Sequence, residues 1–246
     1  MPLQASRVLK TFKYAMYFDG VDDYVRTASQ IALSTPLTVV AWFNHIDKFN
    51  SLTLVANAKT GSQSLGFRFY INSWPTMDRR LIIEIGTGTS GSGVYAPANT
   101  VQPGVWNHGV AVMSGSSSSL WLNGQKIRSG SLFDFTKTDY IYIGAMVDLY
   151  YLSGYIAQVL IYSRALSDSE ISYNYLYPDN PIRDGLVLWL RADPNNVKDI
   201  DNDGINEWID LSGYNNHGKI YGASLVQVVK PASRILPKAR ILNKLR

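Results

Sequence analysis

The sequence of 246 residues contains no cysteine. It therefore has no disulfide framework, no thiolate metal site and no cysteine nucleophile. Histidine is scarce, and the spacing of His45, His108 and His217 is not that of metal ligands. We expect His108 to be a hydrogen-bonded structural residue and not a base. No Gly-x-Ser-x-Gly elbow is present, although the sequence leaves a Ser-His-Asp arrangement open.

Long apolar runs are also missing. No stretch approaches the length of a membrane span, and residues 1–10 contain no apolar run long enough for a signal peptide. The formal net charge is +4, but residues 230–246 hold six basic residues and no acidic one, which leaves −2 for the rest. This basic tail, with Arg234 and Arg240, could bind nucleic acid phosphate, lie on a neighbouring copy or remain solvated.

The composition is that of a globular β protein. Hydrophobic residues make up 46% and aromatic residues 12%, enough for a sizeable core. The sequence also has one helix signal, the capping box of Ser167 and Glu170, and one glycine-rich segment, 86–100, which we expect to be a flexible loop. Short strands are predicted at 14–18, 24–27, 37–44, 52–57, 65–71, 80–85, 106–113, 140–144 and 154–162, with a hairpin at 120–127. The pattern predicts an all-β, two-sheet antiparallel sandwich with jelly-roll connections, one short helix and a C-terminal extension.

The turn at residues 18–25, Phe-Asp-Gly-Val-Asp-Asp-Tyr-Val, joins two predicted strands. It gathers three carboxylates, Asp19, Asp22 and Asp23. Such a cluster either binds a cation or caps backbone amides in a tight turn, and the residue types leave both alternatives open.

Three segments together resemble a known family. They are residues 18–25, residues 106–112 with 120–124, and residues 154–171. Their order and spacing are similar to those of laminin-G-like, concanavalin A-like jelly-roll domains, over residues 14–177. The resemblance implies a sandwich that binds glycans or proteins, often with one calcium ion at its edge. Where the family usually has Ile-Asp-Glu-Val, this chain has Ile-Ala-Gln-Val at 156–159, which argues against an ion at Asp22 and Asp23, although Asp148 could contribute to one.

A second resemblance lies out of its usual order. Residues 185–193 and 208–223 look like the opening segment of the same family, which normally precedes the Phe-Asp-Gly turn. Residues 182–226 could complete their own sandwich, complete a neighbouring copy by strand exchange, or form a small lobe. The basic tail would then begin at 227. Contacts between copies are expected from Leu186, Leu188, Trp189, Ile220, Tyr221, Arg234 and Arg240.

Residues 199–210 fit the calcium-loop pattern Asp-x-Asp-x-Asp-Gly. The expected ligands of Ca²⁺ are Asp199, Asp201, Asp203, the Ile205 carbonyl, Glu207 and Asp210. An aspartate at the twelfth position would give a shorter clamp than the usual glutamate, and the alternative is a solvated acidic turn.

Two functions are predicted, neither of them enzymatic. The favoured one is a structural protein of a virion, extracellular surface layer or filament, a homo-oligomer or polymer joined through exchanged strands or tails. The alternative is a glycan-binding adhesion module that uses Trp74, Tyr95, Tyr150 and Tyr151. A glycosidase is less expected because Glu84 lacks a partner carboxylate on its strand. Either function places the protein outside the cell or on a virion surface.

Overall fold

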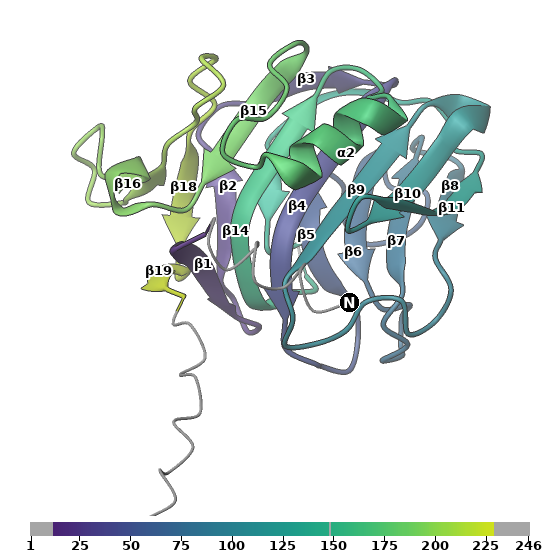
Figure 1. Ribbon diagram of the computed structural model, residues 1–246, viewed down its shortest axis with the longest axis horizontal. Coiled ribbons are helices and arrows are strands. Elements are labelled where there is room, and N and C mark those ends of the chain that lie inside the picture. The colour runs from purple at the N-terminus through teal and green to yellow at the C-terminus, as the bar shows by residue number, and fades with distance from the viewer. Residues whose placement is uncertain (1–11, 148, 229–246) are drawn as a thin grey trace, which may run out of the picture.

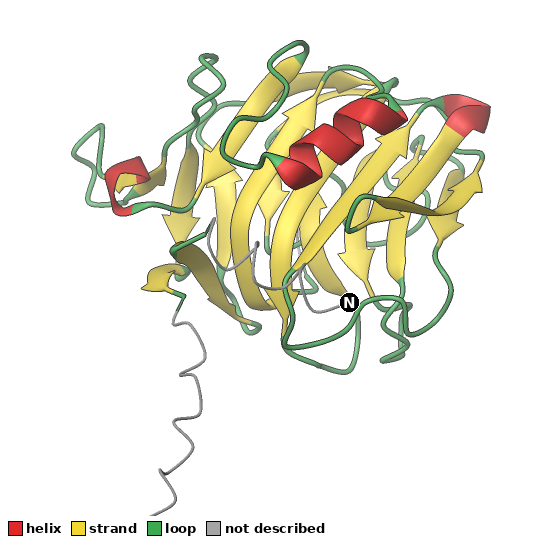
Figure 2. Ribbon diagram, in the orientation of Figure 1, coloured by secondary structure: helices red, strands yellow, loops and turns green. Residues whose placement is uncertain are grey.

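Two antiparallel sheets pack face to face in the computed structural model, which describes residues 12–147 and 149–228 (Figures 1 and 2). The predicted all-β sandwich with a single α-helix in the described residues is confirmed. The first sheet runs in the order β11 (Gln125–Gly130), β10 (Ser118–Leu122), β9 (Asn107–Met113), β4 (Leu37–His45), β14 (Ser153–Tyr162), β1 (Tyr14–Asp19) and β19 (Ser224–Gln227), with β15 (Leu186–Arg191) also paired to β14.

The second sheet is longer and carries the candidate site. Its order is β16 (Val197–Lys198), β17 (Glu207–Trp208), β18 (Gly218–Tyr221), β2 (Tyr24–Thr27), β13 (Tyr142–Ile143), β5 (Leu52–Ala56), β6 (Gly66–Ile71), β7 (Leu81–Gly86) and β8 (Gly91–Tyr95). A small pair, β3 (Ile31–Ser34) with β12 (Thr136–Asp139), and two 3₁₀ turns, η1 (Gly115–Ser117) and η2 (Pro194–Asn196), complete the described elements.

The core lies between the two sheets and follows from the two-residue period of the strands. Phe67, Phe69 and Ile71 alternate along β6, and each is fully buried in the main apolar cluster. Val39 and Phe43 of β4 belong to the same cluster from the opposite sheet. The intervening residues of β6 point to the outer face, where the candidate site lies.

The displaced segment folds back and completes its own sandwich. Strand β15 pairs with β14, β18 pairs with β2, and β19 pairs with β1. In Figure 1 this yellow-green part of the chain lies beside the purple start of the domain. Because its strands join both sheets, the segment is not a separate lobe.

The contacts expected between copies stay a prediction, and the described residues named for them have partners within the same chain. Leu188 is fully buried, and Leu186 and Trp189 are buried in the same chain. Ile220 and Tyr221 pair with Val25 and Tyr24 of β2. The basic tail from residue 229 onward, with Arg234 and Arg240, lies outside the described residues, as does Asp148, whereas Gln227 at the predicted start of the tail is part of β19.

The edge of β14 is shared by two strands. Residues Ser153 to Ile156 pair with β1, and residues Gln158 to Tyr162 pair with β15. Asp19 lies opposite Ser153, whereas Gln158 lies five residues further along β14, roughly 17 Å away at the rise of an antiparallel strand. Side chains at 157 and 158 thus could not share an ion with Asp22 and Asp23, so the absence of carboxylates there does not count against an ion at the turn, although it was expected to.

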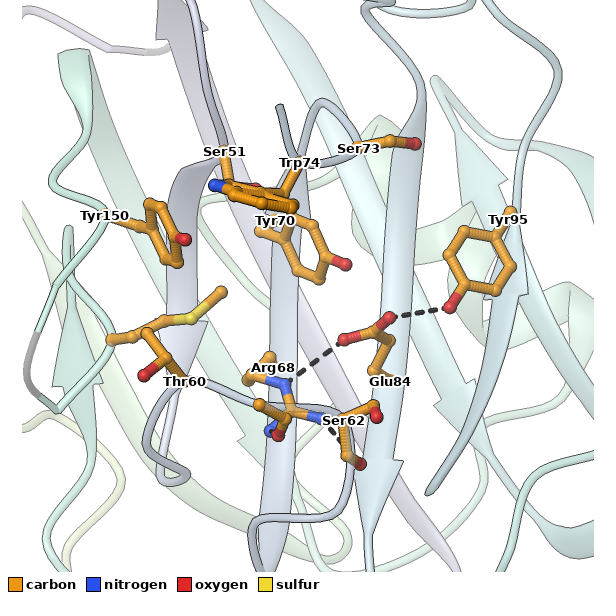
Figure 3. Close-up of a pocket in the computed structure, with 12 residues that line it drawn as sticks. Ser51, Thr60, Ser62, Arg68, Tyr70, Ser73, Trp74, Glu84, Tyr95 and Tyr150 are labelled. Carbon is orange, nitrogen blue, oxygen red and sulfur yellow. Dashed lines mark hydrogen bonds and ion pairs between the residues drawn. The ribbon is translucent and has the colours of Figure 1, made fainter. Parts of the chain in front are cut away.

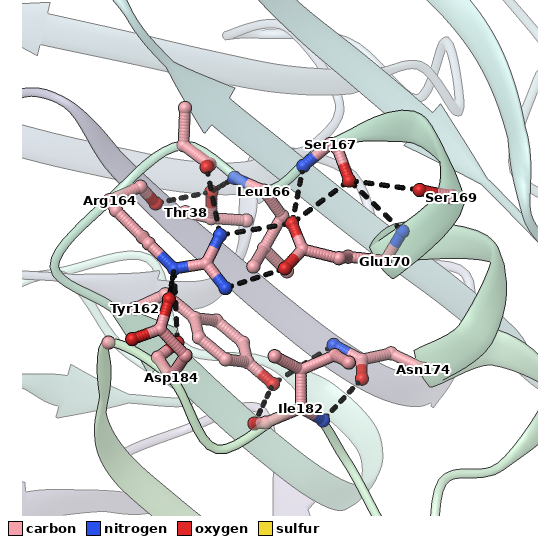
Figure 4. Close-up of polar contacts among 12 residues, drawn as sticks. Thr38, Tyr162, Arg164, Leu166, Ser167, Ser169, Glu170, Asn174, Ile182 and Asp184 are labelled. Atoms are coloured by element: carbon pink, nitrogen blue, oxygen red, sulfur yellow. Dashed lines mark hydrogen bonds and ion pairs between the residues drawn. The ribbon is translucent and has the colours of Figure 1, made fainter.

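Helix α2 (Asp168–Leu176) begins at the predicted capping box. The Ser167 hydroxyl accepts a hydrogen bond from the Glu170 amide, and the Glu170 carboxylate accepts one from the Ser167 amide. Figure 4 shows Arg164 holding the same carboxylate through two hydrogen bonds, of 3.0 and 2.7 Å. Arg164 also pairs with Asp184 at 2.8 Å. This network therefore ties the helix to the start of the displaced segment.

A second set of bonds in Figure 4 fastens the same connection. The Asn174 amide donates to the Tyr162 hydroxyl, which donates to the Ile182 carbonyl, while the Ile182 amide donates to the Asn174 carbonyl oxygen. Three elements, β14, α2 and the segment after the helix, thus meet at one buried polar cluster. The chain is directed from the helix back onto β14, where β15 begins.

We expect Glu170→Gln to lower the free energy of unfolding by about 1–2 kcal/mol at neutral pH. The Arg164 guanidinium lowers the pKa of Glu170 to about 2. A lowered pKa stabilises the fold at pH values above the carboxyl's unfolded pKa of about 4.3, and this contribution disappears as the pH falls toward 2. Urea unfolding of both proteins at pH 7 and pH 2.5 should show a difference at pH 7 that shrinks at pH 2.5.

The matched control is Asp168→Asn on the same helix. The carboxylate of Asp168 is 72% exposed and pairs with Lys126 at 3.2 Å, so its removal should change stability very little. An equal loss for Glu170→Gln at both pH values would contradict the assigned role of the Arg164–Glu170 pair.

Candidate functional site

A pocket of about 520 Å³ opens on the outer face of the second sheet (Figure 3). Strands β6, β7 and β8 supply its floor, and the connections around residues 60–62, 73–74 and 146–150 supply its walls. Its lining combines aromatic rings with hydroxyl and charged groups, from Ser51, Thr60, Gly61, Ser62, Arg68, Tyr70, Ser73, Trp74, Glu84, Tyr95, Met146 and Tyr150.

Strand alternation explains the polar floor. Phe67 and Phe69 point into the core, so Arg68 and Tyr70 point outward. Arg68 lies directly opposite Glu84 on β7, and cross-strand partners share a face of the sheet. The alternating pattern thus places a cation and an anion side by side at the bottom of the pocket.

The guanidinium of Arg68 organises one wall. Only 1% of the residue is exposed, and its Nε donates to Glu84 at 3.2 Å. Its two terminal nitrogens donate to the carbonyls of Lys59, Gly61 and Ser62. Because these donors are used within the chain, Arg68 holds the loop in place and is not a primary contact for a ligand.

Glycines let that loop approach the sheet. A Cβ on Gly86 would lie 2.1 Å from the Ser64 carbonyl oxygen, and one on Gly91 would lie 2.1 Å from that of Ser62. No side chain fits at either position. The glycine-rich segment predicted to be a flexible loop instead contains strand β8, and its glycines make room for the pocket wall.

Glu84 links Arg68 to the far side of the pocket. Its Oε1 accepts a hydrogen bond of 2.6 Å from the Tyr95 hydroxyl, drawn as a dashed line in Figure 3. Burial, together with the neighbouring Glu84 carboxylate, raises the pKa of the Tyr95 and Tyr70 hydroxyls above that of a free tyrosine. Both hydroxyls therefore stay protonated at neutral pH, and the Tyr95 proton is the one donated to Glu84, which leaves the Tyr95 oxygen as an acceptor.

Exposed aromatic rings stand at the upper end of the pocket in Figure 3. Trp74 is 66% exposed, although large apolar side chains are usually buried. Tyr150 is half-buried and packs against an apolar cluster with Tyr70 and Met146. Its backbone has a φ of +60°, which is uncommon for a tyrosine. The pocket thus offers flat apolar surfaces next to a polar floor.

The structure brings together three of the four aromatic residues predicted to bind glycans: Trp74, Tyr95 and Tyr150. Tyr151 does not line the pocket, but lies close enough to Tyr24 to influence its pKa. Sequence reasoning missed Arg68 and Tyr70. The alternation of 65–71 could have found them, because it places both on the outer face with Glu84.

The Asp19–Asp23 turn uses its carboxylates to cap backbone amides. Asp23 accepts from the Asp19 amide at 2.9 Å, and Asp19 accepts from the Val21 amide at 2.7 Å. Burial raises the pKa of Asp23 above the usual aspartate value. Oxygens of Asp19, Asp22 and Asp23 do lie within 4.8 Å of one another, so calcium there stays a prediction.

The acidic loop at 199–210 brings some of the predicted calcium ligands together and pairs others with a lysine. Oxygens of Asp199, Asp201 and Glu207 lie within 4.8 Å of one another. The ammonium of Lys219, however, pairs with Asp201 at 2.9 Å and also with Asp203. Lys219 therefore supplies a positive charge at the place where the ion was expected.

One of the expected calcium ligands, Asp210, has another role. The carboxylate of Asp210 is directed into the chain, where it accepts from the amides of Trp189 and Asn216 at 2.8 and 2.9 Å. Within the loop, the Ile205 amide donates to the Asp203 carboxylate at 2.9 Å. Calcium binding by this loop accordingly remains an untested prediction.

His108 is structural, but its expected hydrogen bonds are absent. It is fully buried on β9 in the first sheet, away from the pocket, and neither ring nitrogen has a hydrogen-bond partner. Its ring lies 4.8 Å from that of Trp42, centroid to centroid. Burial lowers the pKa of His108 to about 3, so it is neutral at physiological pH.

A two-sheet jelly roll with a pocket on one outer face defines the class of this protein. Residues 19–172, more than half of the chain, match the concanavalin A-like lectin/glucanases superfamily. The chain belongs to that superfamily, as the resemblance implied. No curated protein matches it in sequence.

Solved structures show the same fold. A candidate carbohydrate-binding protein from Bacteroides ovatus matches with a TM-score of 0.62 and 17% identity, covering 89% of this chain and 61% of that protein. A SAP-like pentraxin from Limulus polyphemus has a TM-score of 0.49 and 15% identity, covering 66% and 82%. The CBM40 of a Ruminococcus gnavus sialidase, bound to α2,3 sialyllactose, has a TM-score of 0.49 and 18% identity, covering 64% and 95%. At 17% identity, the first of these matches shows the fold alone.

No helix in the described part of the chain is both long enough and apolar enough to span a membrane.

Proposed function

We propose that this protein is a carbohydrate-binding module that holds its ligand in the pocket of the second sheet. The observation that carries the proposal is the exposed Trp74 ring above a floor of hydrogen-bonding groups. Carbohydrate rings present apolar faces of C–H groups and an equatorial rim of hydroxyls. An aromatic ring suits the faces, and protonated tyrosines with serine and threonine hydroxyls suit the rim.

Binding without catalysis is the chemistry that the floor favours. Hydrolysis of a glycosidic bond uses two carboxyl groups on either side of the bond. Among the described lining residues Glu84 is the one carboxylate, and its two oxygens are engaged by Tyr95 and Arg68. The candidate carbohydrate-binding protein from Bacteroides ovatus, which shares the fold, agrees with this proposal.

The comparisons favour this glycan-binding alternative over the structural role in a virion or surface layer. That role depended on strands exchanged between copies, but β15, β18 and β19 lie in the sheets of their own chain. We place the protein outside the cell or on a surface, because the glycans that such a module recognises are found there.

We expect the protein to bind at least one oligosaccharide in a panel of immobilised neutral and acidic oligosaccharides. The substitution Trp74→Ala should weaken that binding by roughly tenfold or more, which corresponds to a loss of about 1.4 kcal/mol in binding free energy. The reason is the loss of the stacking surface. Affinities should be measured by titration calorimetry with the best ligand from the panel.

Tyr214→Ala is the matched control, since Tyr214 is 65% exposed and does not line the pocket. It should bind as the native chain does. An unchanged affinity for Trp74→Ala, or a panel without any bound glycan, would refute the proposed function.

A further inference from the structure

A second cluster of side chains lies on the same outer face of the second sheet, beyond β5. Tyr24 and Arg26 come from β2, Tyr142 from β13 and Tyr221 from β18. The Tyr24 ring stacks on Tyr221 with centroids 4.7 Å apart, and its centroid lies 5.8 Å from that of Tyr142. Tyr221 belongs to the displaced segment, so this cluster forms only because residues 182–226 fold back.

Arg26 is the unusual member of the cluster. Its guanidinium lies over the rings of Tyr140 and Tyr221, 4.7 and 5.6 Å from their centroids. One terminal nitrogen donates to the Tyr221 hydroxyl at 3.3 Å. The Nε is buried and has no acceptor, and no described carboxylate pairs with Arg26. A guanidinium held by neutral rings retains donors for an anion.

The neighbouring cation, Lys219, differs from Arg26 because it has carboxylate partners. Lys219 lies directly opposite Arg26 across the β18–β2 pair. Its ammonium is already neutralised by Asp201 and Asp203, with Glu207 at 3.7 Å. A ligand anion on this part of the sheet would therefore meet Arg26 as its partner.

The strand register connects the two sites. Arg26 lies opposite Tyr142, Tyr142 opposite Ala56, and Ala56 opposite Arg68 on the pocket floor. Directly paired residues share a face, so both arginines lie on the outer side of the sheet, and Ala56 between them is buried in a cluster with Met146 and Tyr150 of the pocket wall. Three inter-strand steps of about 4.8 Å separate Arg26 from Arg68, or roughly 14 Å in total. A single sugar ring cannot span that distance, whereas a short oligosaccharide can.

We propose that Arg26, with Tyr142 and Tyr221, is a second subsite that binds the carboxylate or sulfate group of an acidic oligosaccharide. The proposal rests on the proposed function, because the remainder of the same ligand occupies the Trp74 pocket. The guanidinium would donate charge-assisted hydrogen bonds to the anion, and the tyrosine rings would pack against the sugar that carries it.

The test uses the full chain and matched oligosaccharides. The probes are hexagalacturonate, its carboxyl-reduced neutral counterpart, a sulfated heparin hexasaccharide and a hexaglutamate peptide. We expect the native protein to prefer an acidic saccharide over the neutral one, with no binding of the peptide. Arg26→Gln should weaken acidic binding by about tenfold to a hundredfold and leave neutral binding unchanged. Hexagalacturonate carries carboxylates alone and the heparin probe carries both groups, so binding of hexagalacturonate assigns the subsite to a carboxylate and binding of the heparin probe alone assigns it to a sulfate.

Two further variants control for charge and for folding. Arg128→Gln removes an exposed arginine on β11 of the other sheet and should bind as the native chain does. Arg26→Lys keeps the charge without the planar fork and should lose part of the affinity. Thermal unfolding of each variant shows whether the fold survives the substitution.

The outcomes separate this inference from the proposed function. If Arg26→Gln binds the acidic saccharide as tightly as the native chain does, the second subsite is overturned. If Trp74→Ala at the same time loses binding of the neutral saccharide, the proposed function of the pocket is still supported. If Arg26→Gln loses acidic binding and Trp74→Ala binds the acidic saccharide as the native chain does, the ligand does not occupy the Trp74 pocket. That result would overturn both the proposed pocket and the idea of one ligand shared by the two sites. The assignment of the subsite to carbohydrate would be overturned if the protein bound the peptide as tightly as an acidic saccharide. It would also be overturned if the protein bound no acidic saccharide.

Discussion

Leu188→Asp should abolish cooperative folding of the full chain. Leu188 is fully buried in the main core and lies opposite Ile161 of β14. An aspartate there would be charged in an apolar environment or would have to take up a proton, and both cost free energy. We expect a loss of more than about 4 kcal/mol, a large part of the 5–15 kcal/mol that stabilises a typical domain.

Circular dichroism and urea unfolding would measure this effect. Leu176→Asp is the control, since Leu176 is 50% exposed at the end of α2 and its replacement should change stability by less than about 0.5 kcal/mol. The unfolding midpoint of the native chain should not depend on protein concentration, because β15 belongs to the same chain as β14. A midpoint that rises with concentration would instead indicate strands exchanged between copies.

Arg68→Met should destabilise the fold by about 3 kcal/mol and disorder the pocket wall. The substitution leaves Glu84 without its cation in a site where the Glu84 side chain is 15% exposed, and breaking such a pair typically costs 3–5 kcal/mol. It also removes the donors that hold the carbonyls of Gly61 and Ser62. Carbohydrate binding should decline together with stability.

The double variant Arg68→Met, Glu84→Gln distinguishes the two effects. Because the double variant has no unpaired carboxylate, it should recover part of the stability that Arg68→Met loses. The loop carbonyls would still lack their hydrogen-bond donors, so carbohydrate binding should stay weak. Urea unfolding and titration with the best panel ligand measure the two quantities. Full recovery of binding in the double variant would show that Arg68 does not organise the loop.

The local features of the fold were predictable from sequence because they depend on neighbouring residues. The capping box at Ser167 and Glu170 specifies the start of α2, since both partners lie within one helical turn. The alternation of 65–71 specifies which side of β6 enters the core. The glycine-rich segment was misjudged, because the close approach of residues 62–64 that requires its glycines is a tertiary contact.

The candidate site could be predicted only in part. Trp74, Tyr95 and Tyr150 were recognisable as aromatic residues in or next to loops, but Tyr151 met the same criterion and does not line the pocket. Whether neighbouring aromatic residues share a site depends on the path of the loop, here on the positive φ of Tyr150. In the same way, the acidic pattern at 199–210 indicated calcium without showing that Lys219, on a strand after the loop, would pair with it.

By itself the sequence determined the class of the protein: two sheets, one helix, and a superfamily membership carried by motifs at 18–25 and 154–171. Only the tertiary structure decided where the displaced segment goes. Its strands had apolar faces that could be buried against any copy of the sandwich, and the hydrophobic effect has no direction by which to choose among them. The choice follows from the polar cluster of Tyr162, Asn174 and Ile182 after α2, which returns the chain to its own β14 and brings Tyr221 beside Arg26.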